Sequence, residues 1–149
     1  MLSVFGSNTM SLDRGTKIYA GILGSLVGLS LLAWLLTLDF RLAEIDEMLK
    51  QDKQIAAYPY TFRALEIKGA TAIISTPRTS AVPAVKFLSM IFPRLSRKSE
   101  QDPDVIAAQK QLGEIQGKVR KLVLNREDIE RVSWRIDKDW YAQKGVLID

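Results

Sequence analysis

One uncharged apolar stretch near the N-terminus constrains the fold of this chain more than any other feature. From Ile18 to Leu38 the sequence reads IYAGILGSLVGLSLLAWLLTL, without a charged residue. A helix rises about 1.5 Å per residue, so a stretch of this length can cross a hydrocarbon core that is about 30 Å thick. We therefore predict a transmembrane helix over residues 18–38, preceded by a flexible tail over residues 1–17, and expect a single-pass membrane protein.

The flanks of this stretch fit an anchor better than a cleaved signal peptide. Tyr19 and Trp34 lie near its two ends, where aromatic rings favour the membrane interface. The apolar core of a signal peptide is about 7–15 residues long and ends at small residues, which is not the pattern here. Arg14 and Lys17 make the N-terminal flank slightly the more positive one, which favours a cytoplasmic N-terminus. The membrane would be the plasma membrane, or the thylakoid in a photosynthetic source.

Small residues form a stripe along the predicted span. Ala20, Gly24 and Gly28 recur every four residues, and Gly21 and Ser25 lie beside them. Such a stripe allows a second helix to approach closely, so it is a candidate contact with another membrane protein or with a second copy of this chain. The alternative is that glycine is simply common in membrane helices, and a single motif of this kind does not decide between the two.

Composition argues against most enzyme classes. The chain has no cysteine, which excludes disulfides and thiolate metal sites, and no histidine, the commonest general base and metal ligand. We therefore expect a non-enzymatic protein without a cofactor or a metal. The formal net charge of +4 suits an anionic lipid surface or an acidic partner, but it is too weak to indicate nucleic acid.

The first half of the polar region predicts a helix and a hairpin. Apolar residues at helical spacing, such as Leu42, Ile45 and Leu49, predict a juxtamembrane helix over residues 39–56. Residues 61–67 and 71–76 are rich in β-branched and aromatic residues and are separated by Lys68-Gly69-Ala70, which predicts a β-hairpin.

Two further helices and a last strand follow. We predict a very apolar helix over 81–92, capped by Thr79 or Ser80, then an exposed polar loop over 94–103. A second helix, capped by Asp104, should run to Leu124. The face that we expect it to bury comprises Val105, Ala108, Leu112, Ile115, Val119 and Leu122.

Residues 130–140 alternate as a half-buried strand does. Val132, Trp134 and Ile136 would face the core together with Trp140, and the charged or polar residues between them would face water. The expected fold class is therefore α+β, with residues 57–149 forming a small sheet of about three strands packed with two to three helices.

This order of elements resembles a BON domain. The segments that carry the resemblance are residues 42–52, 65–69, 72–75, 112–123 and 129–132. The sequence departs from the family where Ser75-Thr76 replaces the usual glycine after the second strand, where a glycine before the last strand is missing, and where residues 77–104 would form an insertion. The resemblance covers less than half of the chain and implies lipid binding in a cell envelope.

Two carboxylate pairs and one serine–lysine pair are the candidate reactive groups. Asp137 and Asp139 could face the same side of the last strand, but we expect a solvated turn there. Helix capping explains Asp102 and Asp104 better than metal binding does. A surface lysine beside an incidental serine explains Lys86 and Ser89 better than a catalytic dyad.

A more informative candidate is the apolar and basic segment over residues 82–98. It could lie in the membrane interface or meet a partner, although a core helix followed by a solvated basic loop is the simpler interpretation. The candidate surface residues are Phe87, Met90, Ile91, Phe92, Arg94, Arg97 and Lys98.

Three functions follow from these features. The main hypothesis is an accessory or assembly subunit of a larger membrane complex, based on the small-residue stripe and the apolar segment. The alternative is a BON-like module that binds a lipid surface through its basic residues. A membrane-tethered enzyme is the third and least supported.

Overall fold

The computed structural model describes residues 13–37 and 40–149. The chain divides into two compact units, residues 1–38 and residues 39–149, and each is described by itself. The predicted tail over residues 1–17 lies outside the described residues, except for its last five positions.

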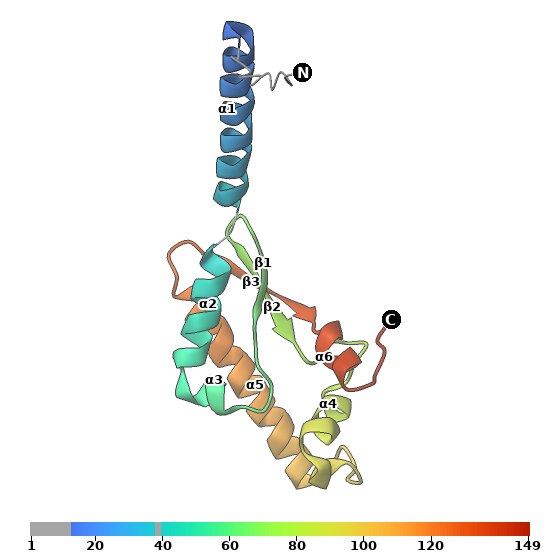
Figure 1. The fold of residues 1–149 in the computed structure, drawn as a ribbon. Coiled ribbons are helices and arrows are strands. Elements are labelled where there is room, and N and C mark those ends of the chain that lie inside the picture. Colours follow the sequence, from blue (N-terminus) through green and yellow to red (C-terminus); the bar gives the residue numbers. More distant parts are fainter. Residues whose placement is uncertain (1–12, 38–39) are drawn as a thin grey trace, which may run out of the picture. The chain divides into compact units, whose positions relative to one another are not determined.

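The described part of the first unit is one helix, α1 (Arg14–Thr37; Figure 1). It begins four residues before the predicted span, at Arg14. Its apolar side chains are exposed on every side, as Ile22, Leu29 and Trp34 illustrate at 56, 63 and 61 %. The helix is long and apolar enough to cross a membrane, which supports the predicted span by length and composition.

The second unit is an α+β domain with a three-stranded sheet, as predicted. Its elements in chain order are α2 (Phe40–Gln51), α3 (Lys53–Ala57), β1 (Ala64–Lys68), β2 (Thr71–Thr76), α4 (Ala84–Ile91), the 3₁₀ turn η1 (Pro93–Leu95), α5 (Pro103–Leu124), β3 (Arg131–Ile136) and α6 (Lys138–Gln143).

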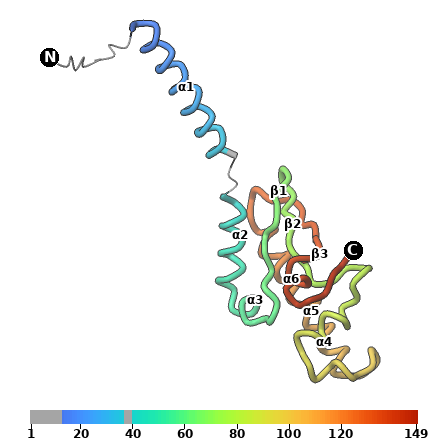
Figure 2. Tube along the Cα trace, turned by 45° about the vertical axis from the view of Figure 1, so that its right-hand side comes forward, coloured from blue at the N-terminus to red at the C-terminus, as the bar shows by residue number. Residues whose placement is uncertain are grey.

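The predicted juxtamembrane helix is two helices, α2 and α3. Asp52 separates them, because its backbone is extended and its side chain accepts hydrogen bonds from the main-chain N–H groups of Gln54 and Ile55. Asp52 is therefore the N-cap of α3. Ile45 and Leu49 are buried, and α2 lies alongside β1 (Figures 1 and 2).

The sheet is mixed, with β2 in its centre. β1 and β2 form the predicted antiparallel hairpin, whose turn places Gly69 at a φ of +59°, a conformation that glycine adopts without strain. β3 pairs with β2 in parallel. A parallel pair needs a long crossover connection, and here α4 and α5 provide it.

The long helix α5 begins at Pro103, and its N-cap is Asp102 rather than the predicted Asp104. The Asp102 carboxylate accepts a hydrogen bond from the main-chain N–H of Asp104, and proline is favoured at the first helical position. The predicted buried face is confirmed for Val105, Ala108, Leu112, Ile115 and Val119. Val123 completes it in place of the half-buried Leu122.

The helix α4 is shorter than predicted, because it begins at Ala84 with Pro83 as its N-cap. The Thr79 hydroxyl accepts hydrogen bonds from the main-chain N–H groups of Ala81 and Val82, so it stabilises a turn before the helix and does not cap it. The following segment is less exposed than predicted, since Leu95 in η1 is buried.

The predicted strand over 130–140 is wrong at its end, because β3 stops at Ile136. Asp137 accepts a hydrogen bond from the main-chain N–H of Trp140 and caps α6, so Trp140 belongs to a helix. Within β3 the predicted alternation is confirmed: Val132, Trp134 and Ile136 pack against the core, and the residues between them are exposed.

Aromatic rings fill the core where α4 and α6 meet the segment before β1. The ring of Tyr60 contacts Phe62, Phe87 and Trp140 at centroid distances of 4.9, 5.7 and 5.8 Å. Tyr60 and Phe87 are both fully buried. Rings in edge-to-face contact stabilise a core beyond the area that they bury, so this cluster fixes α6 and α4 in place.

Candidate functional site

The small residues of α1 lie on one face of the helix. Ala20, Gly24 and Gly28 follow each other at intervals of four residues, which stacks them one turn apart. A Cβ atom built on Gly21, Gly24 or Gly28 would meet nothing within 4 Å. The Ser25 hydroxyl donates a hydrogen bond to the carbonyl of Gly21 at 2.8 Å. This face of the helix therefore has room for a close approach, and the Ser25 hydroxyl on it is already hydrogen-bonded.

The apolar segment that ends in η1 packs mainly inward. Phe87, which we expected at a lipid or partner surface, is fully buried. Met90, Ile91 and Phe92 are half-buried and pack against the core. A continuous apolar surface is therefore absent from α4, and this part of the segment is a core helix.

The basic residues after α4 differ in their surroundings. Lys98 forms ion pairs with Asp104 and, at 3.4 Å, with Asp102, and the hydrogen bond to Asp104 raises the pKa of Lys98. The Arg94 guanidinium is 3.8 Å from Asp104 and lies over the ring of Phe92 at 5.8 Å. Arg97 is exposed. Only the two arginines therefore present substantial positive charge to an incoming ligand.

A groove lies between the end of α3, α5 and the start of η1. Its volume is about 530 Å³. Its main lining residues are Gln54, Tyr58, Phe92, Arg94, Glu114 and Lys118. It thus combines two cations, one anion and two aromatic rings, which suits a mixed polar and apolar ligand rather than a purely apolar one.

Tyr58 is the unusual residue of this groove. Its side chain is only 6 % exposed, and its hydroxyl is buried without a hydrogen-bond partner among the described residues. Burial raises the pKa of Tyr58 to about 12. A buried hydroxyl without a partner costs stability, so Tyr58 is a weak point in the packing at the wall of this groove.

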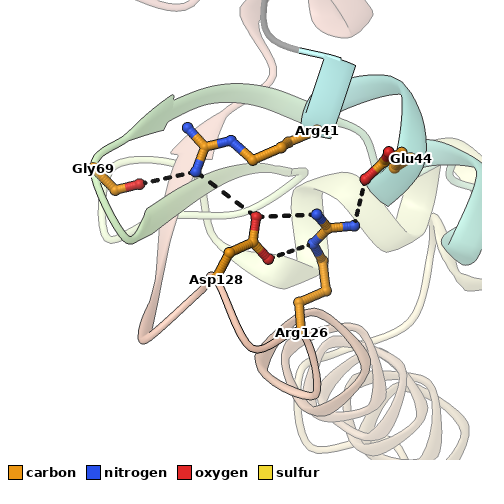
Figure 3. A network of polar contacts seen from close by, with 5 residues as sticks. All are labelled: Arg41, Glu44, Gly69, Arg126 and Asp128. Carbon is orange, nitrogen blue, oxygen red and sulfur yellow. Dashed lines mark hydrogen bonds and ion pairs between the residues drawn. The ribbon is translucent and has the colours of Figure 1, made fainter.

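A polar network joins the first turn of α2 to two loops (Figure 3). Arg126 donates to both carboxylate oxygens of Asp128, at 2.8 and 3.0 Å, and to Glu44 of α2 at 2.9 Å. Arg41 donates to the carbonyl of Gly69 at 3.2 Å, and its guanidinium is 3.7 Å from Asp128. The Arg126 hydrogen bonds lower the pKa of Asp128. The network therefore fastens the start of α2 to the hairpin turn and to the loop before β3.

A buried polar cluster around Asp137 was not predicted from the sequence, which indicated a solvated turn. Asp137 is 4 % exposed and accepts hydrogen bonds from the Tyr60 hydroxyl at 2.9 Å and from Arg63 at 3.0 Å. The same carboxylate caps α6. Every contact holds the strand end, the aromatic core and α6 together, so its role is structural. The one sequence signal was an aspartate, a favoured N-cap residue, at this position.

The candidate reactive pairs do not form catalytic arrangements. Asp139 is exposed in α6, whereas Asp137 is buried at its N-cap. The Ser89 hydroxyl donates to the main-chain carbonyl of Lys86 at 2.8 Å, not to its amine. Within residues 13–37 and 40–149, no group of three carboxylates could hold a metal ion.

Comparison with known proteins adds no assignment to this geometry: no protein-family model, no curated protein and no solved structure matches the chain.

Proposed function

We propose that this chain is a single-pass membrane protein that acts as a non-enzymatic accessory or assembly subunit of a larger membrane complex. The observation that carries the proposal is α1, a long helix whose apolar side chains are exposed on all sides and whose small residues share one face.

The exposure of α1 supports a lipid environment. The core helix of a soluble protein would be mostly buried, but the apolar window of α1 is not buried at all. Exposed apolar surface costs about 25 cal/mol per Å² in water, so a helix with this surface needs an apolar solvent. A bilayer provides one around the whole circumference of the helix, with all backbone groups paired inside it.

The small-residue face supports a protein partner within that bilayer. Leucines and isoleucines on the other faces gain little from leaving lipid, which is equally apolar. Along Ala20, Gly24 and Gly28 a second backbone can approach closely, and packing contacts then replace lipid contacts. The soluble domain would contribute further contacts, for which Arg94, Arg97 and the groove at Tyr58 are the exposed candidates.

The experiment is purification of the tagged full-length protein in mild detergent, followed by mass spectrometry of what remains bound. We expect a stoichiometric membrane protein. The variant Gly24→Leu with Gly28→Leu should lose it, because two leucines on the small-residue face would keep a second helix from approaching closely. If the wild-type protein purifies alone, the accessory-subunit proposal fails.

A matched control is Ala33→Leu, which adds the same kind of side chain on the opposite face of α1. It should retain the partner and remain in the membrane fraction. If Ala33→Leu releases the partner as readily as the glycine variants do, the loss reflects general damage to the helix and not the small-residue face.

The exposed arginines after α4 support a second candidate, a module that binds an anionic lipid surface. Arg94 is 65 % exposed, and Arg97 is also exposed. Cations near an anionic surface contribute about 1 kcal/mol each. The test places the protein in nanodiscs of neutral lipid and adds vesicles rich in phosphatidylserine. The protein should capture these vesicles, and the variant Arg94→Glu with Arg97→Glu should not. Unchanged capture would exclude these arginines as the lipid site.

A further inference from the structure

The outer edge of β3 carries unpaired backbone groups. β3 is the last strand of the sheet, with β2 on one side only. The N–H groups of Arg131 and Asp137 donate to Ala70 and Thr76 on the β2 side. In a strand, the backbone N–H and C=O groups of successive residues point to opposite sides. Those of Val132, Trp134 and Ile136 therefore point away from β2. Within residues 40–149 these outward groups have no hydrogen-bond partner.

The other edge of the sheet is protected, which makes the β3 edge distinctive. α2 lies alongside β1, and the Asp46 carboxylate accepts a hydrogen bond from the main-chain N–H of Ala64 at 2.7 Å. Proteins usually cover or blunt an edge strand, because an uncovered one is a template for pairing with another chain. Here one edge is covered and the other is available.

Side chains beside the β3 edge favour particular residues in an added strand. On the face away from the helices, Arg131, Ser133 and Arg135 are exposed. Arg135 already donates a hydrogen bond to Glu66 of β1 at 2.8 Å, so Arg131 is the main attraction for an acidic residue opposite the strand, and Arg135 would share its charge with Glu66. On the helix side, a hollow of about 410 Å³ adjoins Trp134, and its lining mixes apolar Pro83 and Ala84 with polar residues such as Arg78 and Gln116. It can receive a small side chain from a strand placed next to β3.

We propose that the β3 edge binds an extended acidic segment of a partner polypeptide as a fourth strand of the sheet. Main-chain hydrogen bonds to Val132, Trp134 and Ile136 would provide the affinity, and the arginines and the hollow would select the side chains. A second copy of β3 is a poorer occupant, because it would bring its own two arginines to the same face. The inference rests on the proposed function, because it names the kind of partner segment that the subunit would hold.

The first test uses the full-length protein in detergent micelles and two synthetic peptides. One alternates glutamate and valine, and the other alternates lysine and valine. Amide hydrogen exchange is followed by NMR at Val132, Trp134 and Ile136, with Ser133 and Arg135 as internal references on the β2 side. We expect rapid exchange at the three outward amides, slowed about tenfold or more by the glutamate peptide and not by the lysine peptide.

A matched pair of variants tests the charge preference at one exposed position. Ser133→Glu places a carboxylate between the two arginines, whereas Ser133→Lys adds a third cation. Each cross-strand charge pair contributes about 0.2–1 kcal/mol, so the glutamate variant should bind the glutamate peptide roughly 1.5- to 5-fold more weakly and the lysine variant more tightly. Both variants keep the outward backbone groups, and their far-UV circular dichroism should match the wild type.

Three outcomes would overturn the proposal. The first is that neither peptide slows exchange at the outward amides. The second is that both peptides do so equally, which would remove the acidic preference. The third is protection that rises with protein concentration alone, which would make a second copy the occupant. Failure of the proposed function is separate: it appears as a wild-type protein that purifies without a partner, whatever the peptides do.

Discussion

The helix α1 and the domain over residues 39–149 place their apolar side chains in opposite directions. In α1, Trp34 and Leu36 are 61 and 78 % exposed, whereas in the domain Tyr60 and Phe87 are fully buried. The domain has the arrangement that water imposes, with an apolar interior and a charged surface. The helix has the arrangement that lipid permits, with its backbone paired inside and its apolar side chains outside. The domain is thus suited to water, and the helix is suited to an apolar solvent.

The largest expected effect comes from placing charged residues among the exposed apolar side chains of α1. Leu26→Arg with Leu29→Arg puts two charges near the middle of the span, where each arginine costs about 3 kcal/mol to insert. The variant should leave the carbonate-washed membrane fraction and appear in the soluble or aggregated fraction. Leu26→Ala with Leu29→Ala should stay in the membrane. An arginine variant that remained membrane-bound would argue against α1 as the anchor.

The next effect compares two phenylalanines of the same segment. Phe87→Ala should lower the free energy of unfolding by about 3–5 kcal/mol, because it removes a fully buried ring from the aromatic cluster. Phe92→Ala should cost about 1 kcal/mol, since Phe92 is only half-buried. Urea unfolding of the full-length protein in detergent, followed by tryptophan fluorescence, measures both. Equal losses would show that the segment does not divide into a core part and a surface part.

The sequence predicted correctly those elements that depend on patterns within a few neighbouring residues. The alternation in β3, the buried face of α5 and the turn at Gly69 each follow from spacing within a few residues. The α+β class then follows, because such elements must bury their apolar faces against each other. The boundaries were less predictable: Asp102 is the helix cap where Asp104 was predicted, and Asp137 caps a helix where a continued strand was predicted.

Long-range features could not be predicted from a single sequence. The parallel pairing of β2 with β3 depends on packing across the whole crossover. The burial of Asp137 depends on Tyr60 and Arg63, which are distant in the chain. Tyr58 is similar, since nothing near it in the sequence shows that its hydroxyl would be buried without a partner. The candidate surfaces on α1 and after α4 remain predictions.

A third effect concerns alkaline pH and tests how dry the domain interior is. Burial raises the pKa of Tyr58 and Tyr141 to about 12 and raises the pKa of Tyr60 further. Below about pH 9 these tyrosines are neutral in both states, so their ionisation does not affect stability. Above that pH the unfolded chain loses protons that the folded domain retains, so the free energy of unfolding should fall by about 4 kcal/mol by pH 11.

Chemical unfolding at pH 8, 10 and 11 measures this loss. Tyr58→Phe removes one of the three titrating groups together with its unpaired hydroxyl, so it should be neutral or stabilising at pH 8 and should reduce the alkaline loss by about a third. An alkaline loss unchanged by Tyr58→Phe would mean that Tyr58 is solvated.

The smallest expected effect concerns the polar network at the start of α2. Arg126→Met keeps the aliphatic packing of a side chain that is 17 % exposed but removes its ion pairs to Glu44 and Asp128. Because the partners are partly solvated, unfolding should become easier by only about 1 kcal/mol, and the difference should shrink in 1 M salt. A loss that did not change with salt would indicate that packing, and not charge, fastens α2 to the loops.

The order of the strands has a consequence for how the protein is made. During synthesis α1 and the β1–β2 hairpin leave the ribosome before β3, which follows only after α4 and α5. Closing a sheet across so long a connection is slow, because the entropy of the loop is lost before the pairing contacts form. Until then β2 has an unpaired side and the apolar face of the hairpin is uncovered. If α1 anchors the chain as proposed, a nascent chain tethered to the bilayer in this condition would depend on chaperones more than a free domain of the same size would.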